Sequence, residues 1–283
     1  MSAEAMQTAA SFVQHLAGDL NTGDLELPMF PDSVVRIQKA FQAEEVDIDE
    51  IVQLIGTDPG IAARVLQLAN SAAVRGAAEI KELRQAVIRL GNKMVQSSVL
   101  TFALRQAERN EKISRESRQA LHEIWEDSVE LAARCHVIAK EYTKLRADEA
   151  MLTGLLSVIG RLYILWKYDE CAMSNYAELE TILSDWHPTI GKAIVESWNM
   201  ADEIASALEL QLETDPPLQE SATYAEVLCA ARLIFQNESL GEPLVGSEYP
   251  LLQRLGIADY EDSTVTLDAH AVAIEAIRQG LRG

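Results

Sequence analysis

The sequence has few cysteines, few histidines and an excess of acidic over basic residues. Its three cysteines, Cys135, Cys171 and Cys229, are too few and too scattered among 283 residues for a disulfide framework or a cysteine-based zinc site. We therefore expect three reduced thiols in a cytosolic protein. None of the five histidines forms a His-x-x-x-His or a His-Asp motif, and the nearest metal-like pair, His122 and Glu126, is typical of a surface helix.

Positive charge is scarce overall but concentrated in one segment. The chain carries 24 lysines and arginines against 44 acidic residues, a net charge of −20, which opposes loose attachment to anionic lipid or to bulk nucleic acid. Residues 61–120 hold 11 basic and five acidic residues, a net +6, so the rest of the chain carries −26. Two explanations stay open: this basic segment packs on the acidic remainder of its own chain, or it forms a face that binds an anion or a partner.

No stretch of the chain has the composition of a signal peptide or a clear membrane span. The N-terminus lacks both a basic start and a long apolar core. Residues 150–166 are apolar except for Arg161 and two hydroxyl side chains, and an arginine near the centre of a spanning helix would cost about 3 kcal/mol. We expect this segment to be a buried core helix of a cytoplasmic protein that does not enter the membrane.

Apolar residues recur at helical spacing, and alternating β-branched runs are nearly absent, so the sequence predicts an all-α protein. Asp47 with Glu50, and Asp58 with Pro59, have the spacing of helix N-terminal caps, and Gly91 is expected as a left-handed C-cap. Polar residues 108–118 mark the expected boundary between two packed helical lobes. After it we expect helices over residues 121–142, 150–166, 179–183, 188–198, 202–212, 224–235 and 268–277, with loops over 214–217 and 241–250.

The sequence also lacks the motifs of common catalytic sites. No nucleophile elbow, phosphate-binding loop or dinucleotide fingerprint occurs in it. Gly154 and Gly160 lie six residues apart in an apolar helical segment with no strand before them, so we expect them to permit close helix packing. The four tryptophans fall at or near apolar helical positions and are expected in the core or between the lobes: Trp125, Trp166, Trp186 and Trp198.

Three ordered blocks of sequence carry a specific resemblance. They are LPMFPDSVVRIQKA from Leu27, IVQLIGTDPGIAARVLQLANSA from Ile51 and LRQAVIRLGNKMVQSSVL from Leu83. In the order and spacing of these blocks, the chain from Leu27 to Leu212 resembles the bacterial HDOD family. The pattern includes positions of structural importance, which in this sequence are Pro28, Pro31, Asp58, Pro59, Asn70, Gly91, Gly154 and Gly160.

The resemblance implies a site that has lost its metal ligands. HDOD domains look like divergent relatives of the HD metal-dependent phosphohydrolases, in which histidine and aspartate side chains hold metal ions that activate water. The second lobe is therefore expected to be HD-like, with a serine and a valine in place of the His-Asp pair. His187 is expected to cap or pack rather than to bind metal. The positions of the degenerate site in this sequence are Asp127, Ser157, Val158, His187 and Leu210.

The resemblance also implies a non-enzymatic bacterial signal-transduction adaptor that needs no cofactor and acts through protein–protein contact. The expected partner is a signalling protein, and an anionic partner or ligand would be steered to the first lobe. Two alternatives are a residual HD-type phosphohydrolase or phosphodiesterase and, resting only on the basic segment, a nucleic-acid-binding protein. The candidate partner-binding residues are Arg84, Arg89, Lys93 and Arg105.

The same resemblance divides the chain into three parts. Residues 1–26 are expected to form an N-terminal helical extension. Residues 27–212 are expected to form the HDOD domain, with the first lobe ending at about residue 112 and the HD-like lobe starting at about residue 117. Residues 213–283 are expected to form a C-terminal helical extension that packs on the HD-like lobe.

Overall fold

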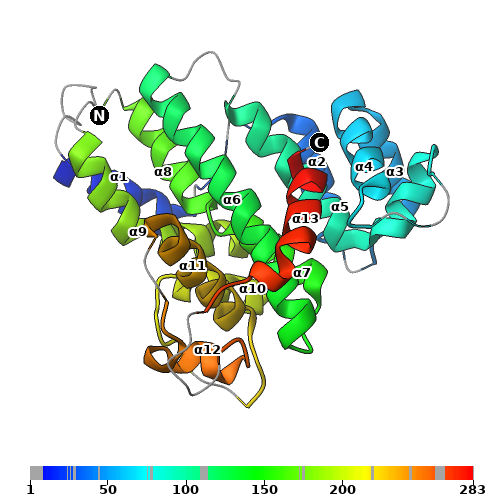
Figure 1. The fold of residues 1–283 in the computed structure, drawn as a ribbon. Helices are drawn as coiled ribbons and strands as arrows, with labels where there is room; N and C mark the ends of the chain where they lie inside the picture. The colour runs from blue at the N-terminus through cyan, green and yellow to red at the C-terminus, as the bar shows by residue number, and fades with distance from the viewer. Residues whose placement is uncertain are drawn as a thin grey trace.

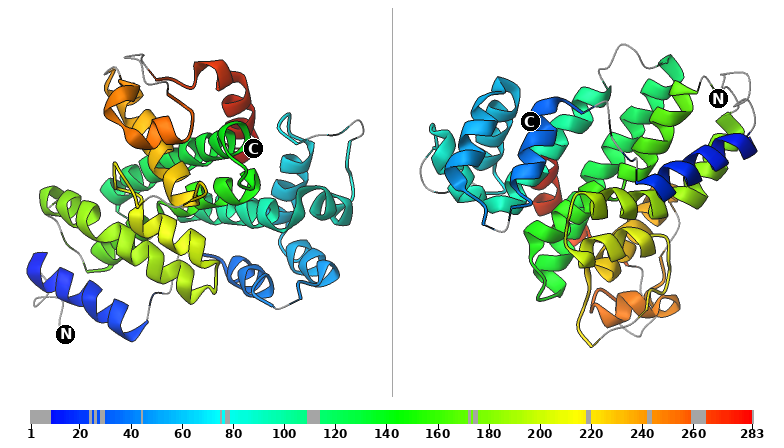
Figure 2. Two further views of the ribbon diagram at one scale, coloured as in Figure 1. Left: turned by 90° about the horizontal axis from the view of Figure 1, so that it is seen from below. Right: turned by 180° about the vertical axis from the view of Figure 1, so that it is seen from behind.

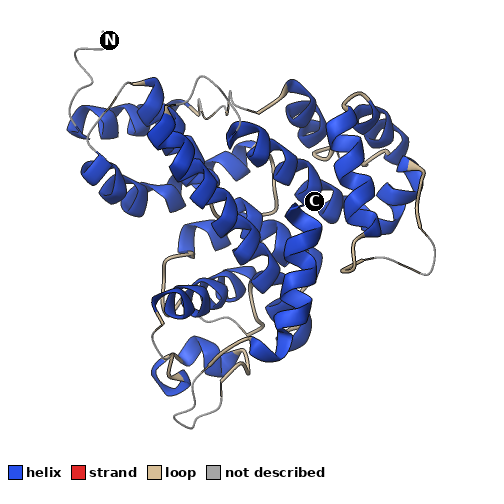
Figure 3. Ribbon diagram, turned by 45° about the horizontal axis from the view of Figure 1, so that its top comes forward, coloured by secondary structure: helices blue, strands red, loops and turns tan. Residues whose placement is uncertain are grey.

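The computed structural model describes residues 9–282, apart from residues 24, 26, 28–29, 44, 75, 77–78, 109–113, 172, 174–175, 218–219, 242–243 and 259–264. Pro28, one of the family-pattern positions, lies outside the described residues. Within the described ranges every regular element is helical (Figure 3), which confirms the predicted all-α class.

The helices fall into an N-terminal and a C-terminal series. The first series is α1 (Ala9–Thr22), α2 (Asp32–Ala40), α3 (Ile48–Gly56), α4 (Pro59–Asn70) and α5 (Leu83–Glu108). The second series is α6 (Arg115–Tyr142), α7 (Ala147–Leu156), α8 (Ile159–Glu170), α9 (Tyr176–Ser197), α10 (Asp202–Leu210), α11 (Tyr224–Leu240), α12 (Pro250–Arg254) and α13 (Ala271–Arg282). Two short 3₁₀ turns, η2 (Gly246–Glu248) and η3 (Asp268–His270), lie in the C-terminal region.

The helices pack into two lobes (Figure 1), as expected. Helices α2, α3 and α4 pack against α5, which also contacts α6 and α7 of the larger lobe and so joins the two. Helix α1 does not lie on the first lobe: it packs against α9, at one end of the larger lobe (Figure 2). There the buried Asp19 carboxylate accepts a hydrogen bond from the Tyr163 hydroxyl at 2.7 Å, and Lys167 lies 3.4 Å away. The N-terminal extension is thus fixed to the second lobe.

Short polar side chains set the starts of α3 and α4. The Asp47 carboxylate accepts the backbone N–H of Asp49 at 2.8 Å, and α3 ends at Gly56, as the sequence predicts. The Asp58 carboxylate accepts the N–H of Gly60 at 2.9 Å, with Pro59 as the first helical residue of α4. These groups satisfy backbone donors that the first turn of a helix leaves unpaired.

Asn70, at the end of α4, holds the loop that leads to α5. Its side-chain amide donates to the carbonyl oxygens of Leu66 and Ile80 at 3.0 and 2.8 Å. Its Oδ1 accepts the backbone N–H of Ile80, also at 2.8 Å. One side chain therefore replaces the backbone pairing that the loop itself does not provide.

Gly91 interrupts α5 and divides it into two helical parts. The expected positive φ is confirmed at +70°, but ψ is 168° rather than the value of a left-handed C-cap, and this region is open in practice only to glycine. On its two sides α5 contacts α2, α3 and α4 of the first lobe and α6 and α7 of the larger lobe.

The expected single helix over residues 150–166 is two helices, α7 and α8, separated at Ser157 and Val158. The Ser157 hydroxyl donates to the carbonyl oxygen of Gly154 at 2.7 Å, inside a turn that is itself buried. By length and composition the stretch Ala147–Glu170 would pass as a membrane span, but 83% of its most apolar window is buried within the fold. Its apolar character is thus that of a core segment, as expected.

Two other helices are longer than expected. The sequence suggests separate helices before and after His187, because Pro188 lacks a backbone N–H, but α9 continues through Pro188 to Ser197. Helix α11 continues beyond Phe235 to Leu240 and ends at Gly241 in the left-handed conformation. Packing along α9 outweighs the local signal of Pro188. The last turn of α11 is mostly exposed, and its end is set by the glycine cap.

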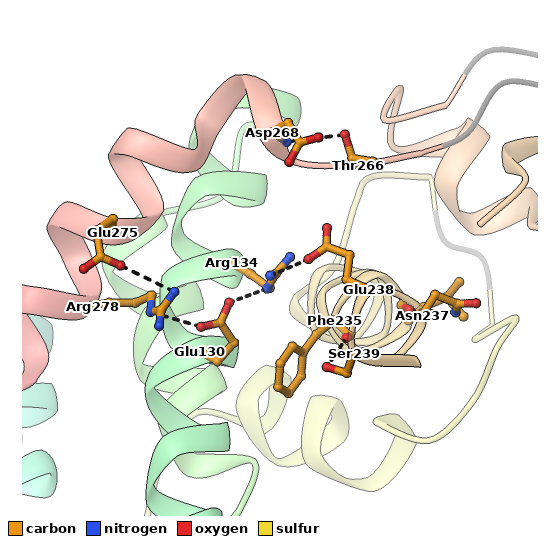
Figure 4. Close-up of polar contacts among 11 residues, drawn as sticks. Glu130, Arg134, Phe235, Asn237, Glu238, Ser239, Thr266, Asp268, Glu275 and Arg278 are labelled. Atoms are coloured by element: carbon orange, nitrogen blue, oxygen red, sulfur yellow. Dashed lines mark hydrogen bonds and ion pairs between the residues drawn. The ribbon is translucent and has the colours of Figure 1, made fainter. Parts of the chain in front are cut away.

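The C-terminal helix is attached to α6 and α11 by charged side chains (Figure 4). Arg134 of α6 donates to Glu130 at 2.8 Å and to Glu238 of α11 at 2.7 Å. Arg278 of α13 lies 3.1 Å from the other oxygen of Glu130. Because α13 also contacts α4 and α5, the C-terminal segment packs on the second lobe and reaches the first.

Two glycines allow helices to approach more closely than a side chain would permit. A Cβ atom on Gly154 of α7 would lie 2.7 Å from the backbone of Ala132 in α6. A Cβ atom on Gly160 of α8 would lie 2.0 Å from the carbonyl oxygen of His187 in α9. Both distances are too short for any side chain, so these contacts require glycine.

Replacing Gly160 with alanine is expected to destabilise the protein by about 3 kcal/mol or more, because the added methyl group would push α8 away from α9. Urea unfolding followed by circular dichroism measures the change. The matched control is Gly18→Ala in α1, where no atom lies within 4 Å of the added Cβ and alanine favours the helix by up to about 1 kcal/mol. Equal stability of Gly160→Ala and Gly18→Ala would contradict the close contact.

Candidate functional site

A cavity of about 720 Å³ lies in the second lobe, lined mainly by side chains of α6, α8, α9 and α11. We call it the central pocket. Each of these helices contributes polar side chains, among them Asp127 from α6, Arg161 from α8, His187 from α9 and Arg232 from α11. The pocket therefore contains two of the five positions expected for the degenerate metal site, Asp127 and His187.

Asp127 is engaged in an ion pair. Its carboxylate accepts a hydrogen bond from Arg161 at 2.6 Å, and both side chains are partly exposed to the pocket. A charge-assisted contact this short neutralises most of the negative charge that a metal ion would need. Asp127 thus serves as a partner for an arginine in this structure.

His187 is buried, with 3% of its surface exposed. Its Nδ1 lies 2.7 Å from the carbonyl oxygen of Leu183, so Nδ1–H donates and Nε2 carries the lone pair. Burial, together with the nearby positive charges of Arg232 and Arg161, lowers the pKa of His187 to about 4 against the opposing effects of the Leu183 carbonyl and the Gln211 side chain. His187 is therefore neutral at neutral pH.

The Nε2 atom of His187 has no hydrogen-bond partner. The buried amide of Gln211 lies beside it, but Gln211 Nε2 already donates to the carbonyl oxygen of Leu208 at 2.8 Å. The Oε1 atom of Gln211 also has no hydrogen-bond partner. Because Oε1 of Gln211 and Nε2 of His187 are both acceptors, they cannot form a hydrogen bond with each other. Two neighbouring buried acceptors therefore lack a donor, and one of them belongs to His187 of the pocket wall.

The other three expected positions do not line the pocket. Ser157 and Val158 are fully buried in the turn between α7 and α8, and the Ser157 hydroxyl is used within that turn. Leu210 ends α10, and its carbonyl oxygen accepts the thiol of Cys229 at 3.2 Å. None of the three offers an imidazole or a carboxylate to a metal ion.

Arg161 and Arg232 are the pocket residues that sequence reasoning missed as functional candidates. Arg161 entered the sequence argument only as a charge that disfavours a membrane span. Arg232 is a single charge within the apolar run Cys229–Phe235, and that isolation is the signal that could have identified it. No ion pair or hydrogen bond joins Arg232 to another residue in the described parts of the chain, and burial lowers its pKa.

The donor set does not fit the metal centre of an HD phosphohydrolase. Among the described residues, no group of three His, Cys, Asp or Glu side chains lies close enough to hold a metal ion. Asp127 is paired with Arg161, and two guanidinium groups on the wall would repel a divalent cation. No step of chemistry is therefore derived through a metal at this site.

The four candidate partner-binding residues lie along α5 and do not form one cluster. Arg84 is exposed and pairs with Asp49 of α3 at 2.9 Å, whereas Arg89 is half-buried and contacts the carbonyl oxygen of Ala69 at 3.4 Å. Lys93 is half-buried just after Gly91. Arg105 lies 5.3 Å from the ring of the buried Trp125, across the boundary between the lobes. The use of these residues in partner binding stays a prediction.

The low pKa of His187 makes stability depend on pH in a definite direction. Unfolded His187 binds a proton near pH 6.5, whereas the folded protein binds it near pH 4, so its contribution is full above pH 6.5 and is lost as the pH falls. Between pH 6.5 and 4 the free energy of unfolding of the wild type should fall by about 3 kcal/mol more than that of His187→Gln. Urea unfolding at each pH measures the difference, and an NMR titration of the imidazole checks the midpoint. Equal pH dependence of the two proteins, with a midpoint near 6.5, would contradict the buried neutral imidazole.

Comparisons with known proteins show the family and the fold of the chain. The profile of the HDOD domain matches residues 27–213. A candidate metal-dependent phosphohydrolase from Shewanella amazonensis is 22% identical, covers 96% of this chain and 99% of its own, and superposes with a TM-score of 0.71. An HDOD domain protein of unknown function from Geobacter sulfurreducens is also 22% identical, with coverages of 94% and 98% and a TM-score of 0.61.

Two further relatives differ in length. A candidate signal transduction protein from Marinobacter aquaeolei is 20% identical with a TM-score of 0.61, and the match covers 97% of this chain and 66% of that one. An uncharacterised protein of Treponema pallidum is 25% identical over 199 residues, which are 65% of this chain but only 37% of that curated relative. The likeness to the solved structures establishes the HD-like helical fold, and the family match covers most of the chain. The chain belongs to the HDOD domain family.

Proposed function

We propose that this protein is a non-enzymatic signal-transduction adaptor of the bacterial cytoplasm that acts through protein–protein contacts. The observation that carries the proposal is the loss of metal ligands at the positions that the family pattern assigns to the HD site. Where a phosphohydrolase needs a His-Asp pair, this chain has Ser157 and Val158, which lie in the buried turn between α7 and α8, and Asp127 of the central pocket is held by Arg161. HD-type hydrolysis uses metal ions to activate water, and these replacements remove ligands for those ions.

The surface that we assign to a partner lies on the first part of α5, on Lys93 just after Gly91 and on the start of α3. Ile48 and Ile88 are exposed by 37% and 54%, large values for isoleucine, and the exposed Arg84–Asp49 pair joins the two helices that carry them. Arginine beside exposed apolar side chains is typical of interface centres. Since residues 61–120 carry a net +6, the partner that fits this surface is an acidic protein.

The alternative function is a residual HD-type phosphohydrolase or phosphodiesterase. The name of the Shewanella amazonensis relative supports it, because that protein shares the fold along almost its whole length. The pocket of this chain argues against it, since neither Ser157 nor Val158 can coordinate a metal ion in place of histidine and aspartate.

A double charge reversal tests the partner surface. Arg84→Glu with Lys93→Glu should weaken binding of a partner purified by affinity capture by about tenfold or more, because two attractive contacts become repulsive. The control reversal, Lys140→Glu with Lys144→Glu, changes the same charge on exposed side chains at the end of α6 and should leave the Kd unchanged. Calorimetric titration gives both values, and an unaltered Kd in the α5 variant would refute this placement.

A further inference from the structure

We propose that the central pocket binds a small organic anion, a carboxylate or a phosphate monoester on an apolar body, through Arg232 and Arg161. This inference goes beyond the adaptor function, and it concerns a different surface from the one assigned to the partner. The pocket volume of about 720 Å³ is that of a site for a metabolite-sized ligand.

The first argument is the charge balance of the pocket wall. Asp127 is the only carboxylate that pairs with a pocket arginine among the described residues, and its oxygen lies 2.6 Å from Arg161. Arg232 is left half-buried with no ion pair or hydrogen bond to another described residue. The second acidic side chain on the wall, Glu180, is exposed to solvent. One desolvated positive charge is therefore uncompensated, which is costly unless an anion binds there.

The second argument is independent of charge. His187, a residue of the pocket wall, is 97% buried, and its Nε2 is an acceptor without a donor. Buried polar atoms without partners are rare in folded proteins and mark places where a further molecule completes the hydrogen bonding. A hydroxyl group of a ligand, or the P–OH of a phosphate monoanion, would donate to this nitrogen while its anionic oxygens accept from Arg232.

The third argument concerns the apolar part of the ligand. Phe235 of α11 lines the pocket, and two large apolar side chains on its wall remain exposed, Leu212 by 42% and Leu240 by 71%. Exposed leucines beside a cationic pocket indicate a ligand that is apolar at one end and anionic at the other. A free inorganic anion would leave these side chains uncovered.

Phenyl phosphate and benzoate are the probes, and phenol is the uncharged control. We expect both anions to bind the full-length protein in calorimetric titrations and phenol to bind at least tenfold more weakly. Arg232→Gln should reduce anion affinity at least tenfold, because it removes the unpaired charge and no ion pair of the fold. The matched control, Arg84→Gln, removes the same charge from the first lobe and should bind the probes as the wild type does.

A second variant keeps the test informative if Arg232→Gln fails to fold. Leu240→Glu changes an exposed side chain at the pocket and should weaken anion binding by repulsion without affecting stability. Absence of binding by both anions at millimolar concentration, or wild-type affinity in Arg232→Gln or Leu240→Glu, would overturn the assignment. None of these outcomes would bear on the α5 surface. Failure of the anion-site proposal can therefore be distinguished from failure of the adaptor proposal.

Discussion

The contact between α8 and α9 at Gly160 is the constraint on which the second lobe depends. Because no side chain fits between Gly160 and the His187 carbonyl oxygen, the two helices approach at backbone distance. In this arrangement the backbone carbonyl group of His187 faces α8, and the His187 residue also lines the central pocket. Gly154 sets α7 against α6 in the same way, so that α6 presents Asp127 to the same cavity. The glycines thus determine the shape of the pocket.

Sequence reasoning succeeds where the cause is local and fails where it is tertiary. The caps at Asp47 and Asp58 follow from neighbouring residues, and the structure has them at the expected places. The continuation of α9 through Pro188 depends instead on packing along both sides of that residue, which no local pattern contains. The same holds for Arg232: only the fold shows that this arginine forms no ion pair with a described residue, because the nearby Asp127 is paired with Arg161.

The charge distribution gives the protein two cationic features on an acidic background. The net charge of −20 repels most anions at a distance, and both features are local exceptions to it. The first lies on the surface of α5, where salt weakens its effect. The second, Arg232, is partly removed from solvent, where an unpaired charge is costly and its interaction with an anion is correspondingly strong. The proposed function and the proposed anion site together imply that this lobe has exchanged cation binding for anion recognition.

This exchange can be tested by titrating the metal-free protein with Mn²⁺ in a calorimeter. The account predicts no stoichiometric binding at micromolar metal, because Asp127 is paired with Arg161, and Ser157 and Val158 supply no ligand. One or two equivalents of Mn²⁺ bound with micromolar Kd, and lost in both Asp127→Ala and His187→Ala, would contradict it.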